Sequence, residues 1–181
     1  MPNRLTDLGW VLAVGLVWLI GCEAASVQAA GQLDQSFGVS RGYSVLPLNQ
    51  GGLDRDQARA IGLRPDGRIV LAGFTQTASG TVAGLYQVTK QGLPDSSFGE
   101  GDGKATFLDP SEPALSVFIL AMVLQSDGQI LLAGEREGLP GSSNSGIVLR
   151  GRADGSGLDS GFGTAGVVVI GEMRAVYAIA L

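Results

Sequence analysis

The sequence predicts an all-β fold made of repeated antiparallel units, and three features carry this prediction. Residues 60–73 come back as residues 121–134, and a third copy begins at Ala178. Each full copy has an apolar run, a polar turn containing Asp-Gly, and a second apolar run that ends in Ala-Gly. The chain of 181 residues is also rich in glycine, with 29, and only 16% charged. This composition is typical of strands joined by many tight turns.

Each copy is predicted to be a β-hairpin. Pro65 presets the first central position of a turn that Asp66 and Gly67 complete, and Asp127 and Gly128 keep the turn in the second copy. The flanking runs are rich in Ile, Val and Leu, which suits strands. They are nearly continuous, which is typical of strands buried on both faces. A helix is disfavoured because Asp-Gly interrupts each run.

A second motif, Asp-x-x-Phe-Gly, recurs in register with the hairpin. The Phe-Gly pairs are 61 and 64 residues apart, and a period in this range is typical of arrays and propellers, whose units cannot bury an apolar face alone. The predicted turn residues of both motifs are Asp34, Phe37, Gly38, Asp66, Gly67, Asp95, Phe98, Gly99, Asp127, Gly128, Asp159, Phe162 and Gly163.

One unit is interpreted as four strands, and the residues between the two motifs supply the third. The predicted strands are about 58–63, 68–74, 82–89 and 103–108, and then 117–124, 129–135, 145–151 and 166–170. Residues 43–48 are predicted to be a fourth strand with no unit before it. Four antiparallel strands per unit of about 60 residues describe a β-propeller blade. We therefore expect an incomplete propeller of about two and a half blades: 32–48, 49–108, 109–170 and the start of a third at 171–181.

The two motifs and their spacing resemble the delta-60 repeat family, over about residues 32–181. This resemblance implies a β-propeller-like fold and an exported bacterial protein, and it implies no catalytic residues. The sequence departs from the pattern at Pro94, Ser126 and Gly157, which are interpreted as loop adjustments.

The amino terminus is predicted to be an export signal. Leu8 to Ile20 is an uninterrupted apolar stretch, short for a membrane-spanning helix and suited to the apolar region of a signal peptide. Leu19-Ile20-Gly21-Cys22 follows and resembles a lipobox, so residues 1–22 are predicted to be a lipoprotein signal with Cys22 as the lipidated residue, and 23–31 a linker. Cleavage after Ala29 and an uncleaved anchor are the alternatives. We expect a cell-envelope lipoprotein, at the outer membrane or periplasmic face, or a secreted protein.

Composition excludes several kinds of chemistry. The chain has no histidine and one cysteine, which excludes Ser-His-Asp and Cys-His catalysis, imidazole metal sites and an intrachain disulfide. The net charge is −5 without a basic cluster, so a nucleic-acid partner is not expected. We expect no catalytic, cofactor-binding or metal-binding residues.

Two sets of acidic residues have functional alternatives. Asp34, Asp95 and Asp159, with Glu100 and Asp102 beside the second, could bind calcium, but fixing of turns by the aspartates is favoured. The four acidic residues of the unlike loops could pair as acid and base, although solvated charges are favoured; they are Asp54, Asp56, Glu135 and Glu137. The recurring phenylalanines are interpreted as packing between neighbouring sheets rather than a binding row.

The function predicted is that of a non-catalytic binding module. In a propeller, the Asp-Gly and Phe-Gly turns lie at one end of each sheet and the remaining connections at the other. These connections, 49–57, 75–81, 109–116 and 135–145, differ between copies, and unlike loops are where function usually lies. We expect a protein or glycan partner there. The alternatives are a propeller-type hydrolase or lyase using acidic residues, or a truncated fragment without independent activity. Self-association through open sheet edges is also expected.

Overall fold

The computed structural model describes residues 31–48, 50–51 and 55–181. The chain divides into two compact units, Met1–Gln32 and Leu33–Leu181, and the second is described below. The predicted signal, Cys22 and most of the predicted linker lie outside the described residues. The part of the chain that is described contains no helix, and so none long and apolar enough to cross a membrane.

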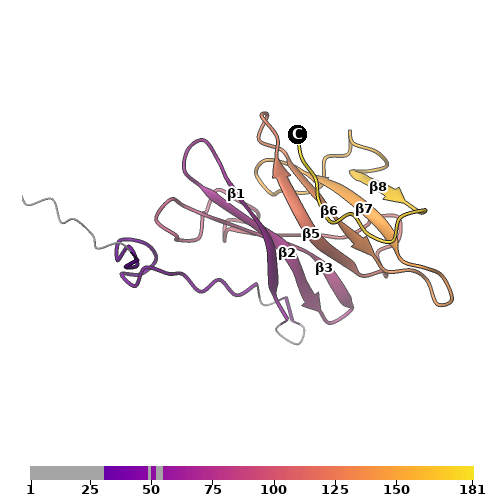
Figure 1. Cartoon of the computed structure of the whole chain (residues 1–181), viewed down its shortest axis with the longest axis horizontal. Coiled ribbons are helices and arrows are strands. Elements are labelled where there is room, and N and C mark those ends of the chain that lie inside the picture. Colours follow the sequence, from indigo (N-terminus) through magenta and orange to yellow (C-terminus); the bar gives the residue numbers. More distant parts are fainter. Residues whose placement is uncertain (1–30, 49, 52–54) are drawn as a thin grey trace, which may run out of the picture. The chain divides into compact units, whose positions relative to one another are not determined.

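The described residues form two antiparallel sheets of four strands each (Figure 1). The first sheet contains β1 (Gln57–Leu63), β2 (Ile69–Thr77), β3 (Gly80–Val88) and β4 (Lys104–Phe107). The second contains β5 (Val117–Leu124), β6 (Ile130–Arg136), β7 (Ser145–Gly151) and β8 (Val167–Ile170). In both sheets the spatial order of the strands is their order along the chain. The all-β prediction with four-stranded antiparallel units is therefore confirmed, and the architecture is that of a partial β-propeller.

Three predictions about strands are wrong. Residues 75–81 were expected as a loop, but β2 runs to Thr77 and β3 starts at Gly80, so the hairpin is tighter. Residues 43–48 form no strand and make one isolated bridge, between Gly38 and Tyr43. Residues 171–181 form no strand either. An extended segment becomes a strand only when a neighbour satisfies its backbone groups, and no described segment pairs with these two along their length.

The Ala-Gly pair at the end of each apolar run has a structural cause. The pairing of β1 with β2 shifts register between Ala58 and Ala60, and the pairing of β5 with β6 shifts between Ile119 and Ala121. A Cβ on Gly73 or on Gly134 would overlap the carbonyl group of the opposite strand at this irregularity. Glycine is needed there because a β-bulge brings two backbones close together.

The larger of two apolar clusters in the described residues lies between the two sheets. Its fully buried side chains come from both sheets and from one Phe-Gly loop; they are Val70, Ala83, Leu85, Phe98, Val117, Ile119, Ile130, Leu132, Ile147 and Leu149. The prediction that the strands are buried on both faces is wrong for β1, where Ile61 and Leu63 are 69% and 72% exposed. These side chains lie on the face turned away from the second sheet, because the Cβ direction of Gly62 between them points at Met122 and Leu124.

Candidate functional site

One end of the two sheets carries the connections that differ between the units, and we call it the loop end. It consists of residues 77–80, 108–116 and 137–144. Ser116 joins these segments: its hydroxyl accepts a hydrogen bond from the Thr81 N–H at 3.3 Å, and its carbonyl accepts one from the Glu137 N–H at 2.8 Å. Three of the four connections predicted to share one end, 75–81, 109–116 and 135–145, are therefore in direct contact.

An almost completely buried ion pair fixes the loop end. Arg136 Nη1 lies 2.7 Å from Asp109 Oδ2, and the two side chains are 17% and 1% exposed. The other carboxylate oxygen accepts hydrogen bonds from the Ser111 N–H and hydroxyl. Burial opposes ionisation of Asp109, but these hydrogen bonds and the Arg136 charge outweigh it and lower the pKa of Asp109. The loop that joins the two sheets is thus held by a permanently charged pair.

A polar hollow of about 490 Å³ lies at the edge of the loop end. Glu135 lies beside it and accepts a hydrogen bond from the Asn144 amide, with Arg174 Nε at 3.8 Å from its carboxylate. Arg174 is largely exposed, so its guanidinium is available to a ligand. The hollow is lined by Ser142, Ser143, Asn144, Gly171, Glu172 and Arg174. Hydroxyl, amide and charged groups in one hollow suit a polar ligand.

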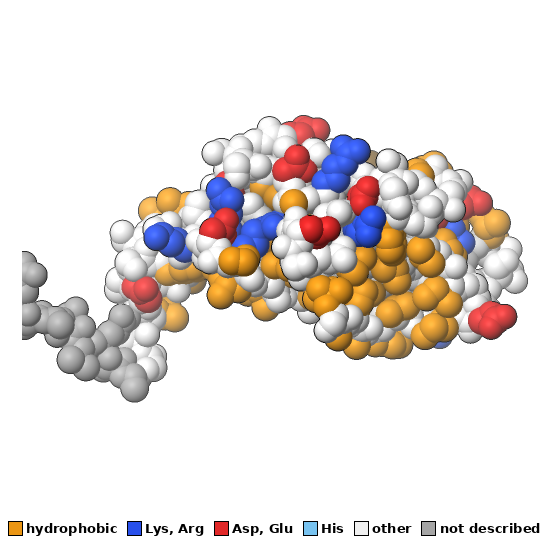
Figure 2. Space-filling model, turned by 90° about the horizontal axis from the view of Figure 1, so that it is seen from above, with side chains coloured by type: hydrophobic (Ala, Val, Ile, Leu, Met, Phe, Trp, Pro, Cys, Tyr) orange, Lys and Arg blue, Asp and Glu red, His pale blue; other side chains and the backbone are white. Residues whose placement is uncertain are grey.

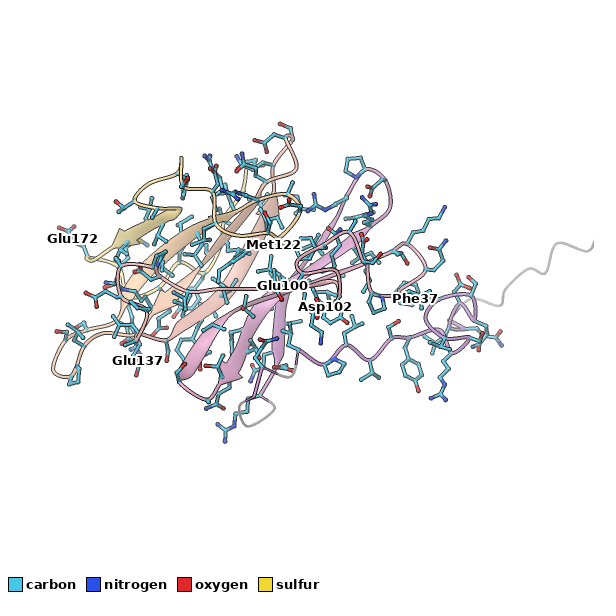
Figure 3. All side chains as sticks on the ribbon, turned by 180° about the vertical axis from the view of Figure 1, so that it is seen from behind. Phe37, Glu100, Asp102, Met122, Glu137 and Glu172 are labelled. Carbon is cyan, nitrogen blue, oxygen red and sulfur yellow. The ribbon has the colours of Figure 1, made fainter. Side chains whose placement is uncertain are left out.

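The loop end is separate from the Phe-Gly loops. In Figure 3, Glu137 and Glu172 lie on one side of the view, whereas Glu100, Asp102 and Phe37 lie toward the centre and the opposite side. Of the acidic residues noted in the sequence, Glu137 therefore lies apart from Glu100 and Asp102.

The acidic residues predicted as a possible acid–base pair have other roles where they are described. Asp54 lies outside the described residues. The Asp56 carboxylate accepts hydrogen bonds from the Thr75 hydroxyl and from the Leu48 N–H, which ties a preceding segment to the first sheet. Glu135 is held by Asn144. Asp56 and Glu135 therefore have structural partners, and the absence of enzymatic activity stays a prediction.

The predicted turn aspartates do fix turns. In each case a carboxylate oxygen accepts the N–H of the residue two positions later, at 2.9 to 3.0 Å. The residues that do so include Asp34, Asp66, Asp95, Asp102, Asp127 and Asp159. Within the described ranges no three acidic or sulfur side chains form a group that could hold a metal ion. The geometry favours the turn interpretation of these residues over calcium binding.

Burial distinguishes the three phenylalanines. Phe98 is fully buried and packs between the two units, as predicted. Phe37 and Phe162 are half-buried. The Arg150 guanidinium lies 4.7 Å from the centre of the Phe162 ring, a cation–π distance.

Sequence reasoning missed a contact between the units made by Arg64. Its Nη1 and Nη2 donate to the carbonyls of Gly128 and Ala153, at 3.0 and 2.7 Å, and its Nε donates to the Gln87 side chain at 2.6 Å. Burial lowers the pKa of Arg64. The signal is positional: Arg64 stands where Gln125 stands in the next unit, directly before the Asp-Gly turn.

The arrangement defines the class of protein as one built from β-propeller-type repeats. Residues 64–98 and 125–162 match a family model described as a domain of unknown function (DUF5122) beta-propeller. The two matches start at the equivalent residues Arg64 and Gln125 and end at the phenylalanines of the Phe-Gly pairs, so the matched unit is the one that the structure repeats. No curated protein matches the chain. The finer resemblance to delta-60 repeats stays a prediction.

Proposed function

We propose that the protein is a non-catalytic, exported scaffold that binds a protein or glycan partner at its loop end. The observation that carries the proposal is the contrast between the two ends of the sheets. The Asp-Gly turns and the Asp-x-x-Phe turns repeat the same hydrogen bonds in both units, whereas the loop end differs between them and contains the polar hollow beside Arg174. Binding residues are commonly found on variable loops that a rigid scaffold holds in place.

Binding at the loop end is tested by replacing residues 138–143 with a Gly/Ser linker of equal length. We expect loss of binding in a glycan array or in cross-linking to envelope proteins, with an unchanged melting temperature, because these residues lie outside the core. A matched control exchanges the exposed residues Glu100 and Gly101 of the Phe-Gly loop for Ser and Asn. Equal binding by the wild-type protein and the 138–143 variant would contradict the proposal.

Export and lipid anchoring form a separate part of the proposal, supported by the apolar stretch followed by Leu19-Ile20-Gly21-Cys22. A cysteine carrying more than one acyl chain would hold the protein stably at a membrane surface. Mass spectrometry of the mature N-terminal peptide should show an acylated Cys22, and Cys22→Ser should release the protein from the membrane fraction. A mature chain starting at Ala30 would instead show ordinary signal cleavage.

A further inference from the structure

A repeated contact joins the first two Phe-Gly loops to the unit that follows each of them. The Phe98 ring covers Gly155, where a Cβ would lie 2.6 Å from the ring, and the Gly99 N–H donates to the Asp154 carbonyl at 2.8 Å. We call this contact the latch.

The same latch occurs one unit earlier. The Phe37 ring covers Gly92 at the equivalent 2.6 Å, and the Gly38 N–H donates to the Gln91 carbonyl at 2.7 Å. Gly92 and Gly155 have positive φ angles of 77° and 74°. Because only glycine combines this backbone conformation with so close an approach, the latch is a specific contact between a phenylalanine and a glycine turn.

The third Phe-Gly pair makes no latch with any described residue. Its phenylalanine therefore lacks a described seat, by which we mean the glycine turn that receives the ring. Phe162 is not among the nearest neighbours of any glycine in the described part of the chain. Arg150 instead stacks on its ring and bonds to Asp159 at 2.6 Å.

The face of β5–β8 turned away from the first sheet is incompletely covered. Leu131 and Val148 alternate with buried core residues and so lie on this face. Val168 is 36% exposed, whereas Ala105 at the equivalent position of the first sheet is 8% exposed. Figure 2 shows hydrophobic side chains gathered in a broad patch on the same side of the picture as β5–β8 in Figure 1.

The last residues of the chain cover part of this face and run across the sheet (Figure 1). The Val176 N–H donates to the Gly134 carbonyl at 3.0 Å, and Ala175 is buried. These residues form no strand, and Tyr177 and Leu181 are 74% and 75% exposed. The covering is therefore a partial cap, which is also held by a hydrogen bond from the Gly146 N–H to the Met173 carbonyl.

The free face of β1–β4 is capped in the same partial way by residues 33–48. Leu48 packs over Gly84 and forms an apolar cluster with Tyr86 and Val88, against which Leu46 packs. Ile61 and Leu63 stay largely exposed, although Met122 and Leu124 at the equivalent positions pack over Gly62 inside the core. Both open faces thus carry a short segment of the same chain where a neighbouring sheet would bury more.

We propose that a second copy of this chain docks on the free face of β5–β8, with Phe162 seated on Gly92 of the second copy in place of that copy's Phe37. The 89–92 turn has the geometry of the 152–155 turn that receives Phe98: Gly92 N–H donates to the Thr89 carbonyl as Gly155 N–H donates to the Arg152 carbonyl. Lys90 Cβ lies against Gly67 as Ala153 Cβ lies against Gly128.

The docking exchanges two partial caps for one sheet-on-sheet contact. Residues 33–48 of one copy and 175–181 of the other would be displaced, which leaves Arg174 and the polar hollow in place, and Ile61 and Leu63 would be buried as Met122 and Leu124 are inside the chain. The contact joins different surfaces of the two copies, so it is a head-to-tail interface. The interface is formed by the Phe-Gly turns and the free sheet faces, so the inference goes beyond ligand binding at the loop end.

Two phenylalanines of the same motif should act in opposite directions. Sedimentation velocity of the full chain over a concentration series, in a mild detergent that shields the apolar amino terminus, measures the association. Phe162→Ala should weaken association about tenfold or more, the size expected for a buried aromatic anchor. Phe37→Ala should strengthen it, because the Gly92 seat becomes free.

Gly92→Val closes the seat and should abolish the gain produced by Phe37→Ala. Circular dichroism melting of each variant shows whether it is folded, and Phe162→Ala should melt only slightly below the wild type because its ring is half-buried and contacts Arg150. If the Phe37→Ala variant associates and the wild type is monomeric, the result would support the proposal and show that the partial caps hold the wild type apart. Monomers at all concentrations for both proteins, or association that Phe162→Ala leaves unchanged, would overturn the proposal.

Discussion

The two four-stranded units carry an arginine and a glutamine in exchanged positions. In the first unit Arg64 directly follows β1 and Gln87 is the penultimate residue of β3, whereas in the second unit Gln125 and Arg150 occupy these places. Arg64 reaches forward to two carbonyl groups of the next unit, but Arg150 turns to its own Asp159 and Phe162. The difference shows that one fold can use an arginine in two ways: to bind the next unit, as Arg64 does, or to bind a Phe-Gly loop of its own unit, as Arg150 does.

The largest expected effect tests whether the latch joins the units. Gly155→Ala would place a Cβ 2.6 Å from the buried Phe98 ring, in addition to straining a positive φ. We expect a loss of about 3 kcal/mol in the free energy of unfolding, measured with urea. Gly101→Ala is the matched control, since its φ is also positive but its nearest neighbour would be 3.7 Å away. A loss of only about 1 kcal/mol is expected there, and equal losses would contradict the role of the latch.

The second prediction compares a buried aspartate at the loop end with an exposed aspartate at an Asp-Gly turn. The buried one, Asp109, pairs with Arg136, which occupies in the second unit the position of Thr75 in the first. Asp109→Ala would leave the largely buried Arg136 without its partner, and should cost about 3 kcal/mol. Asp66→Ala also removes a carboxylate that fixes a turn, but this carboxylate is exposed. We therefore expect a loss of only about 0.5 kcal/mol in the free energy of unfolding. Urea unfolding of both variants measures the difference; similar costs would show that the ion pair contributes little.

The third prediction concerns the exchanged pair directly. Arg64→Gln makes the first unit resemble the second and removes the hydrogen bonds to Gly128 and Ala153. Because those carbonyls lose a charged donor, we expect a cost of about 2 kcal/mol in thermal or urea unfolding. Arg152→Gln, at a position exposed to solvent, is the control and should change stability by less than about 0.5 kcal/mol. An unchanged unfolding midpoint for Arg64→Gln would show that this arginine does not stabilise the contact between the units.

The smallest expected effect is a difference in acid sensitivity between Asp95 and Asp159. Asp95 is buried, which opposes ionisation, but bonds from Ser97 and Gln87 and the charge of Arg68 lower its pKa. Hydrogen bonding from the Gly161 N–H and from Arg150 lowers the pKa of the more exposed Asp159. A lowered folded-state pKa gives stability that is present above the unfolded value of about 3.9 and is lost as the pH falls through the folded value.

Acid unfolding followed by circular dichroism below about pH 4 checks this difference. Asp95→Asn should reduce the pH dependence more than Asp159→Asn, because the native contacts of the buried carboxylate are less accessible to solvent. The reverse order would show that burial does not control the acid response of the two units.

Most of the strands and turns could be predicted from the sequence because they depend on local chemistry. Asp66-Gly67 and Asp127-Gly128 predict turns because their backbone preferences act over a few residues, and the apolar runs beside them predict strands for the same reason. Residues 43–48 look equally strand-like and form no strand, because a strand also needs a partner that no local pattern reveals. The seat of each phenylalanine was hidden for the same reason: Phe98 and Gly155 meet across 57 residues of chain.

The sequence by itself determined the period, the four strands of each unit and the turns that join them, since propensity, side-chain alternation and turn chemistry are local. Tertiary structure decided which faces are covered, which aspartates are buried and which arginine reaches the neighbouring unit. Those outcomes depend on distances between residues far apart in the chain, and identical motifs acquire different surroundings according to whether a sheet lies next to them.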